Sequence, residues 1–220
     1  MPLSKRFTPN SSSQSSKFVP LNGEHNSWEV YWSLVEPRLK ERSQGFQYIL
    51  DHLSSLSHEP VIVETGTLRE PHNYEGDGCS TKLFDTWLKY NNGKLFSIDN
   101  DKAAVTEAVR HCKRASIHLS DSVEWLSKCN EEIDVLYLDS FNIQDWNNDW
   151  EAAAHHLKEL LVSFFCLSPG SLLVVDDNVK HPHTGKKIGK GRLIREAMQA
   201  SQMATLVHDG YQEAWMWEVG

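Results

Sequence analysis

Residues 61–67 read Val61-Ile62-Val63-Glu64-Thr65-Gly66-Thr67, a short apolar run that ends in an acid and a small-residue turn. The run is too short for a helix and is rich in β-branched residues, so it predicts a buried β-strand. A glycine directly after the strand allows a sharp turn and a close approach of the backbone to a ligand. An ordinary buried strand and turn has the same pattern, so the segment takes its meaning from the rest of the chain.

Three later apolar runs also end in acids, and segments of helical periodicity separate each run from the next. The runs are 94–99, 133–139 and 171–178. This alternation is typical of strand–helix units around a parallel sheet, which is an α/β fold. Parallel strands have their carboxyl ends at one edge, where open α/β sheets bind ligands. We therefore expect the acids at the four strand ends to gather there. These acids are Glu64, Asp99, Asp139 and Asp177.

Length and composition bound the organisation of the chain. Its 220 residues are the size of one domain with a sizeable core. Residues 1–25 are polar and serine-rich, which predicts a disordered tail. Residues 26–58 predict N-terminal helices, and residues 59–220 contain the strand–helix units. The net charge of −8 argues against nucleic acid as the main partner, because phosphate binding needs a concentrated basic face.

The cysteines and the hydropathy of the chain favour a cytoplasmic protein. The four cysteines, Cys79, Cys112, Cys129 and Cys166, lie far apart and form no Cys-x-x-Cys pair. Neither a zinc cluster nor a disulfide framework is expected, so the thiols should be reduced. The serine-rich start of the chain does not resemble a signal peptide, and no apolar run is long enough to cross a membrane.

The end of the sequence distinguishes two kinds of α/β fold. Two strand-like runs, 204–208 and 212–219, are joined by Asp209-Gly210, a strong signal for a β-hairpin. Strand–helix units followed by such a hairpin resemble the class I S-adenosylmethionine-dependent methyltransferases over residues 45–220. The resemblance implies a single Rossmann-like sheet of seven strands in the order 3-2-1-4-5-7-6, with helices on both faces. On this basis residues 59–220 form a methyltransferase-like domain.

The residues at the strand ends also favour this family over dinucleotide-binding proteins. A dinucleotide requires Gly-x-Gly-x-x-Gly, so that backbone amides can hold the pyrophosphate, and that spacing is absent. A row of acids would repel a pyrophosphate. The same acids suit the positively charged sulfonium and ammonium groups of S-adenosylmethionine.

The resemblance assigns cofactor contacts to particular positions. Glu64 and Gly66 would border the methionine part, Asp99 would accept hydrogen bonds from the ribose hydroxyls, and Ser120 and Asp121 would lie beside the adenine. The further cofactor contacts are expected at Thr67, Asn100 and Asp139. Helix N-caps are an alternative role for the two aspartates at 99 and 121.

The segment between the first strand and its helix is longer than usual. Residues 68–78 intervene, whereas such a turn has about 2–6 residues. The end of the segment could deliver Gly78 and Ser80 to the cofactor's carboxylate at a helix N-terminus. The rest of the segment could form a lid over the cofactor, or it could be an insertion without a role.

The fourth and fifth strands suggest a divalent metal, most plausibly Mg²⁺. Asp139, Asp177 and Asn178 would provide two carboxylates and an amide oxygen. This pattern resembles the metal site of catechol O-methyltransferase and of macrolide-sugar O-methyltransferases. The catalytic lysine of the catechol enzyme has no counterpart at Asn142, so we expect His181 or Asp139 to be the base, with Lys180 as an alternative. Asp176 should point to the opposite face of the strand.

Together these features predict an S-adenosylmethionine-dependent methyltransferase that acts on a hydroxyl of a small molecule of the sugar or natural-product type, with Mg²⁺ assistance. A catalytically degenerate cofactor-binding module and a metal-dependent glycosyltransferase are the alternatives. The expected partner is a small-molecule acceptor, not a nucleic acid or a membrane. The tryptophan-rich run 215–217 could also support a homodimer.

Overall fold

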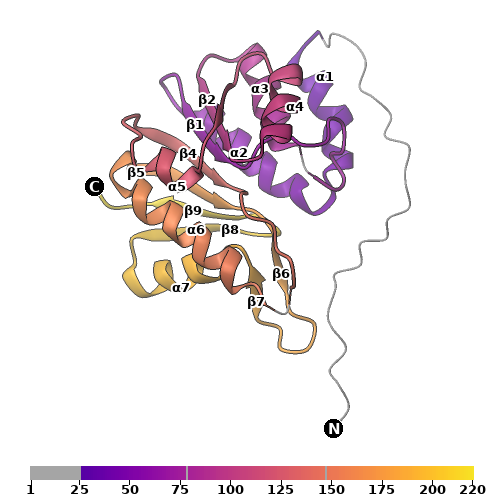
Figure 1. Cartoon of the computed structure of the whole chain (residues 1–220). Helices are drawn as coiled ribbons and strands as arrows, with labels where there is room; N and C mark the ends of the chain where they lie inside the picture. Colours follow the sequence, from indigo (N-terminus) through magenta and orange to yellow (C-terminus); the bar gives the residue numbers. More distant parts are fainter. Residues whose placement is uncertain (1–25, 78, 147) are drawn as a thin grey trace.

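The computed structural model describes residues 26–77, 79–146 and 148–220 (Figure 1). The predicted tail of residues 1–25 and Gly78 lie outside this range. The strands are β1 (Val61–Thr65), β2 (Lys94–Asp99), β3 (Ser116–Leu119), β4 (Ile133–Leu138), β5 (Leu167–Val175), β6 (Asn178–Lys180), β7 (Lys187–Gly189), β8 (Ala204–Asp209) and β9 (Glu213–Trp217). The helices are α1 (Trp28–Val35), α2 (Ser43–Ser55), α3 (Ser80–Tyr90), α4 (Lys102–His111), α5 (Ser122–Leu126), α6 (Trp150–Ser163) and α7 (Arg192–Ser201), with 3₁₀ turns η1 (Glu36–Arg38), η2 (Lys40–Arg42) and η3 (Phe164–Cys166).

A single seven-stranded sheet forms the centre of the molecule, in the order β3-β2-β1-β4-β5-β9-β8. The pairs among β1–β5 are parallel, and β9 is antiparallel to both β5 and β8. The predicted C-terminal antiparallel hairpin is therefore confirmed. The predicted order 3-2-1-4-5-7-6 differs in its numbering because β6 and β7, a separate two-stranded hairpin, interrupt the chain before the last two strands.

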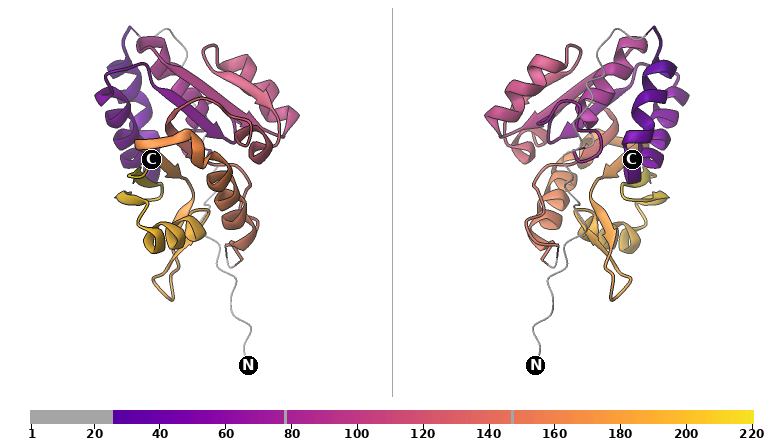
Figure 2. Two further views of the ribbon diagram at one scale, coloured as in Figure 1. Left: turned by 90° about the vertical axis from the view of Figure 1, so that its left-hand side faces the viewer. Right: turned by 90° about the vertical axis from the view of Figure 1, so that its right-hand side faces the viewer.

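Helices cover both faces of this sheet (Figures 1 and 2). Apolar side chains of α1, α2, α3 and α4 pack with one face, and those of α5, α6 and α7 pack with the other. The strands β1 and β4 are buried on both faces, which explains why their sequences are continuous apolar runs rather than alternating ones. The sheet therefore exposes its carboxyl edge, and not its faces, to ligands.

The C-terminal hairpin contributes to the core rather than to the surface. Strand β9 lies between β5 and β8, and its Trp215 and Trp217 are 3% and 1% exposed. The ring of Trp217 packs edge-on against Phe164, with centroids 4.7 Å apart. These two tryptophans therefore do not form the surface on which we based the expected homodimer.

All four cysteines are free thiols. Within the described ranges, no helix is both long enough and apolar enough to span a bilayer.

Candidate active site

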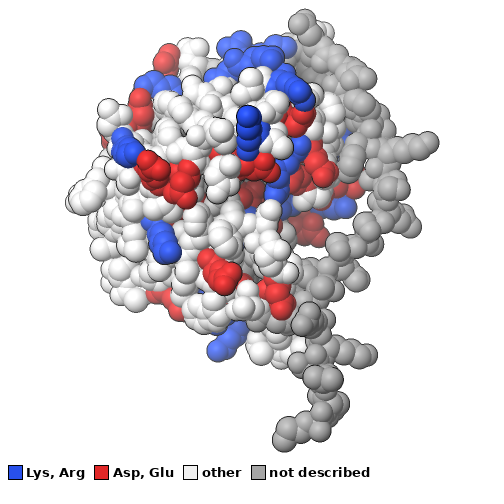
Figure 3. Space-filling view, viewed as in Figure 1, with Lys and Arg blue, Asp and Glu red and all other residues white. Residues whose placement is uncertain are grey.

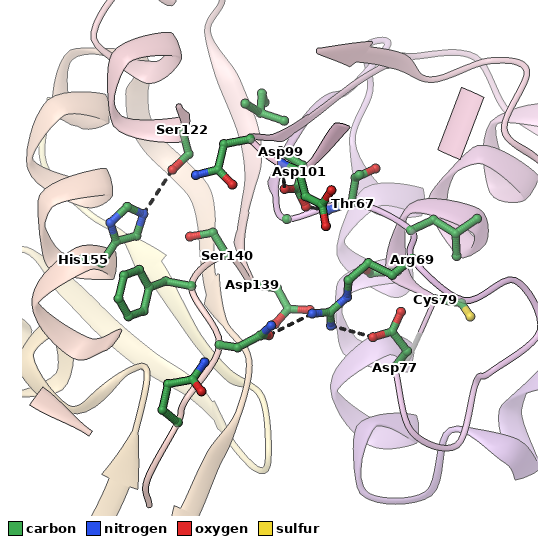
Figure 4. Close-up of a pocket in the computed structure, with 18 residues that line it drawn as sticks. Thr67, Arg69, Asp77, Cys79, Asp99, Asp101, Ser122, Asp139, Ser140 and His155 are labelled. Carbon is green, nitrogen blue, oxygen red and sulfur yellow. Dashed lines mark hydrogen bonds and ion pairs between the residues drawn. The ribbon is translucent and has the colours of Figure 1, made fainter. Parts of the chain in front are cut away.

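A cavity of about 380 Å³ opens at the carboxyl ends of β1, β2 and β4 (Figure 4). Strand β1 pairs with β2 on one side and with β4 on the other, so the cavity lies where the strand order reverses. Four of the predicted cofactor residues line it together with Asp99 and Asp139, and the segments after β1, β2 and β4 supply most of the wall. Its lining includes Gly66, Thr67, Arg69, Asp77, Ser80, Asp99, Asn100, Asp101, Ser122, Asp139, Ser140, Phe141, Asn142 and His155.

Gly66 allows the first strand to turn into the cavity. Its φ of +84° lies in the left-handed region, which residues with a side chain rarely adopt. A Cβ at this position would lie 2.7 Å from the backbone oxygen of Asp139. The ends of β1 and β4 can therefore approach each other only because residue 66 has no side chain.

Asp99 is held at the wall of the cavity by two backbone groups. Its Oδ2 accepts a hydrogen bond from the Thr67 N–H at 3.0 Å, and its Oδ1 accepts one from the Asp101 N–H at 2.8 Å. Asp101, not Asp99, is the N-cap of α4, because its Oδ1 accepts from the Ala103 N–H. The alternative role of Asp99 as a helix cap is therefore wrong. Each oxygen of Asp99 keeps acceptor capacity for a ligand.

Arg69 crosses from the 68–77 segment to the opposite side of the cavity. Its guanidinium donates to Asp77 Oδ1 at 2.5 Å and to Asn142 Oδ1 at 2.9 Å (Figure 4). Asn142 follows β4, so this contact joins the two walls. The segment thus contributes Arg69 and Asp77 to the wall of the cavity.

The far wall of the cavity is built from the start of α5, the end of β4 and α6. Ser122 Oγ and His155 Nε2 are 3.2 Å apart, and the ring of Phe141 stacks on His155 with centroids 5.2 Å apart (Figure 4). Behind them, the buried Glu159 accepts a hydrogen bond from Ser140 at 2.6 Å. Burial alone would raise the pKa of Glu159, but hydrogen bonds and the neighbouring histidines lower it to about 2. An anion behind the wall therefore fixes Ser140 and His155.

Three predicted cofactor residues do not line this cavity. Glu64 is fully buried behind it, where its Oε2 accepts hydrogen bonds from Thr81 and Ser97, each at 2.6 Å. Burial raises the pKa of Glu64 to about 7. Ser120 lines a separate depression, and Asp121 is the N-cap of α5, accepting from the Glu124 N–H. The N-cap alternative for Asp121 is therefore confirmed.

The three aspartates at the ends of β4 and β5, Asp139, Asp176 and Asp177, form what we call the acidic edge. Two buried cations lie among them. Lys190 Nζ is 2.5 Å from Asp139 Oδ1 and 2.9 Å from Asp177 Oδ2. Arg42 bonds to Asp176 at 2.8 Å and to Asp177 at 2.9 Å. As expected, Asp176 points away from the cavity and forms an ion pair.

The two aspartates that share Lys190 differ in environment. Burial raises the pKa of Asp139, although Lys190 opposes the shift. Burial would also raise the pKa of Asp177, but Lys190, Arg42 and the Tyr211 hydroxyl lower it well below its usual range. Asp177 has more hydrogen-bond donors and cations around it than Asp139, so its negative charge is stabilised more strongly.

The side chains expected to bind Mg²⁺ do not fit a metal site. Asn178 Oδ1 accepts from the Gly191 N–H at 2.9 Å, and its Nδ2 donates to two backbone carbonyls. The amide oxygen is therefore turned toward Gly191, and Asn178 is buried and does not line the cavity. Asp139 and Asp177 do approach each other, but the ammonium of Lys190 lies between them. Among the described residues, no group of three or more His, Cys, Asp or Glu side chains is arranged to hold a metal ion.

His181, the expected base, lies in the turn between β6 and β7 and does not line the cavity. This turn projects from the body of the molecule in both side views (Figure 2). The Nδ1 atom of His181 accepts hydrogen bonds from the N–H groups of His183 and Thr184. Its ring thus stabilises the turn at a distance from the cavity lining.

Several residues of the site have no clear signal in the sequence. Ser122 and His155 lie on α5 and α6, whose periodic patterns predict helices but not the face that meets the cavity. Lys190 is preceded and followed by glycines, Gly189 and Gly191, and this spacing could have suggested a close backbone approach. Arg69 lies within the predicted lid, but its partner Asn142 is far away in the sequence.

Solved structures with a similar fold include several methyltransferases. MycE from the mycinamycin biosynthetic pathway, in complex with Mg, SAH and mycinamycin VI, has a TM-score of 0.54 and 16% identity, and the match covers 82% of this chain and 54% of that chain. CalS11, a TDP-rhamnose 3′-O-methyltransferase of calicheamicin biosynthesis, gives 0.51 and 15%, covering 88% and 96%. An rRNA methylase from Streptococcus thermophilus gives 0.50 and 13%, covering 78% and 95%.

No protein-family model matches the sequence, and no curated protein is similar to it at a significant level. The structural likeness at these low identities concerns the fold. The chain has the fold of the class I S-adenosylmethionine-dependent methyltransferases, as the sequence predicted.

Proposed function

We propose that the chain is an S-adenosylmethionine-dependent methyltransferase that acts on a hydroxyl group of a small molecule of the sugar or natural-product type. One observation carries this proposal. The left-handed turn at Gly66 and the carboxylate of Asp99 both line one cavity at the reversal of the strand order. The turn at Gly66 has no side chain, so part of a ligand can pack directly against the backbone. The fixed carboxylate of Asp99 suits a vicinal diol.

The lining of the cavity fits this cofactor. Two backbone amides orient Asp99, and its remaining acceptor capacity would bind the ribose hydroxyls. The half-exposed ring of Phe141 offers a flat surface for a purine. Ser80, the first residue of α3, would present the helix N-terminus to the carboxylate of the cofactor. The acids Asp99, Asp101 and Asp139 favour its positive charge.

Bound S-adenosylmethionine supplies an electrophilic methyl group, and the protein must position the acceptor and remove its proton. Asp139 lies at the end of β4 and lines the cavity, and burial raises its pKa above the ordinary value of a carboxyl group. A carboxylate with a raised pKa is a stronger base than an exposed one, which suits it to general base catalysis. Asp139 would therefore accept the proton of the acceptor hydroxyl. No step passes through a metal ion, because Asn178 and Lys190 leave no suitable ligand set.

Charge favours a small-molecule acceptor over RNA. The chain has a net charge of −8, and acidic and basic side chains are interspersed on the face in Figure 3. Backbone phosphates require a concentrated basic surface. CalS11 is a TDP-rhamnose 3′-O-methyltransferase and MycE is seen with mycinamycin VI, and both share this fold. These likenesses support the sugar or natural-product class.

Ligand-induced thermal stabilisation tests the proposal against its alternatives. We expect S-adenosylhomocysteine to raise the melting temperature. Stabilisation by nucleotide sugars with none by S-adenosylhomocysteine would favour a glycosyltransferase. Radiolabelled S-adenosylmethionine, offered with a panel of sugars, glycosides and nucleotide sugars, then separates an enzyme from a degenerate binding module. Binding without methyl transfer to any hydroxylated acceptor would favour the module.

A further inference from the structure

The segment Gly189-Lys190-Gly191 is fixed against the acidic edge by its backbone. The N–H groups of its three residues donate to Asp149 Oδ2 at 2.7 Å, Asp177 O at 3.2 Å and Asn178 Oδ1 at 2.9 Å. The φ of Gly189 is +120°, and a Cβ there would lie 2.0 Å from the Asp177 backbone oxygen. The position of Lys190 is therefore set by its own backbone and by a contact that only glycine permits.

The ammonium group of Lys190 is fully partnered at the end of this segment. It donates to Asp139 Oδ1 at 2.5 Å and to the Asp139 backbone oxygen at 3.2 Å, and it forms an ion pair with Asp177 Oδ2 at 2.9 Å. A lysine ammonium has three N–H donors, so these three oxygens satisfy it. The side chain is 1% exposed. The ammonium of Lys190 is therefore a buried part of the acidic edge, unlike the ammonium of a flexible surface lysine.

The position of Lys190 is the one that a divalent ion would need. A cation shared by Asp139 and Asp177 must lie between their carboxylates, and the ammonium is already there. Burying both cations together would place unscreened positive charges within a few ångströms of each other. The other expected ligand, Asn178, uses its oxygen to hold Gly191, next to the lysine. Asn178, which was expected to bind the metal ion, therefore helps to position Lys190 instead.

We propose that Lys190 is the resident cation of the acidic edge and takes the place of a divalent metal ion. The lysine holds Asp139 and Asp177 together, and it orients Asp139 beside the cavity. Only this last role rests on the proposed function, because the cation itself can be tested without cofactor or acceptor. Lys190 is a positioning residue, since it lies behind Asp139 and does not line the cavity.

Manganese titration followed by electron paramagnetic resonance tests this directly. Equimolar Mn²⁺ added to the wild-type chain should keep the spectrum of the free ion, and Mn²⁺ should leave the melting temperature unchanged. Lys190→Ala should melt about 6 °C or more below wild type, because it leaves the Asp139 carboxylate without its cation and removes one of the two cations from Asp177. Mn²⁺ should then restore part of the loss.

Lys187→Ala is the matched control, because Lys187, three residues before Lys190, also forms ion pairs, with the buried Glu213 and the partly exposed Asp209. Mn²⁺ should not raise its melting temperature. One tightly bound Mn²⁺ per wild-type chain that disappears in Asp177→Asn would overturn the proposal, as would a Lys190→Ala variant that melts with the wild type. If Lys190→Ala does not fold, the wild-type titration with its Asp177→Asn control decides. Failure of cofactor binding would affect only the proposed function.

Discussion

Gly66→Ala should destabilise the protein through two separable effects. The first is the strain of a Cβ at a φ of +84°, about 1–2 kcal/mol. The second is the collision of that Cβ with the Asp139 backbone, at 2.7 Å from the oxygen and 2.9 Å from the carbon. Overpacking of this kind costs about 1–3 kcal/mol. We therefore expect a total loss of about 2–5 kcal/mol in the free energy of unfolding.

Gly170→Ala provides the matched control. Its φ is +99°, so it carries a similar strain, but a Cβ at this position would have no atom within 4 Å. The difference between the two variants isolates the collision and should be about 1–3 kcal/mol. Urea unfolding followed by tryptophan fluorescence measures both. Equal losses in the two variants would refute the inference that the ends of β1 and β4 require a glycine between them.

Two further substitutions test the lid and the buried acid. Arg69→Ala removes contacts of a side chain that is 42% exposed, and such contacts are worth about 0.2–1 kcal/mol. Calorimetry should therefore show up to about fivefold weaker binding of S-adenosylhomocysteine, with little change in melting temperature. Unchanged affinity, with the exposed Arg110→Ala as control, would argue against a lid. Burial raises the pKa of Glu64 from 4.5 to about 7. Its contribution to stability is therefore present below pH 4.5 and lost as the pH rises through about 7. Urea unfolding at pH 5 and pH 8 measures the free energy of unfolding of Glu64→Gln relative to wild type. From pH 5 to pH 8 this difference should shift in favour of the variant by up to about 3 kcal/mol. A difference that does not change with pH would contradict the raised pKa of Glu64.

The strand ends could be predicted from sequence because their signal is local. Runs such as 61–65 and 133–138 are apolar and β-branched, and strands buried on both faces require that composition. The acids that follow them mark the carboxyl edge, so Asp99 and Asp139 were placed correctly at one cavity. The hairpin at Asp209-Gly210 followed from turn chemistry in the same way.

The metal prediction depended on side-chain directions that the sequence does not contain. Asp177 has a φ of +55°, which breaks the alternation of side chains after β5 and turns Asn178 back toward the chain. Lys190 then reaches the edge from a position 51 residues after Asp139. No spacing rule connects two residues so far apart, and only the tertiary fold brings them together.

Helix caps explain why the adenine side of the site was harder to predict. An aspartate after a strand can cap the next helix or face the ligand, and both roles use the same residue type. In the segment after β2, Asp101 caps α4 and leaves Asp99 to the cavity. After β3 there is a single aspartate, Asp121, and it caps α5. Ser122 then takes the place at the cavity that we had expected for Asp121.

Calorimetric titration with S-adenosylhomocysteine tests the central claim most directly, namely that the cavity beside Gly66 binds this cofactor through Asp99. The wild-type chain should bind one molecule per chain. Asp99→Ala should weaken binding by about 1.5–3 kcal/mol, or roughly 10- to 150-fold in Kd, because it removes charge-assisted hydrogen bonds. Asp121→Ala, whose carboxylate caps α5 away from the cavity, should bind like the wild type. No binding by the wild-type chain, or equal binding by wild type and Asp99→Ala, would contradict the claim.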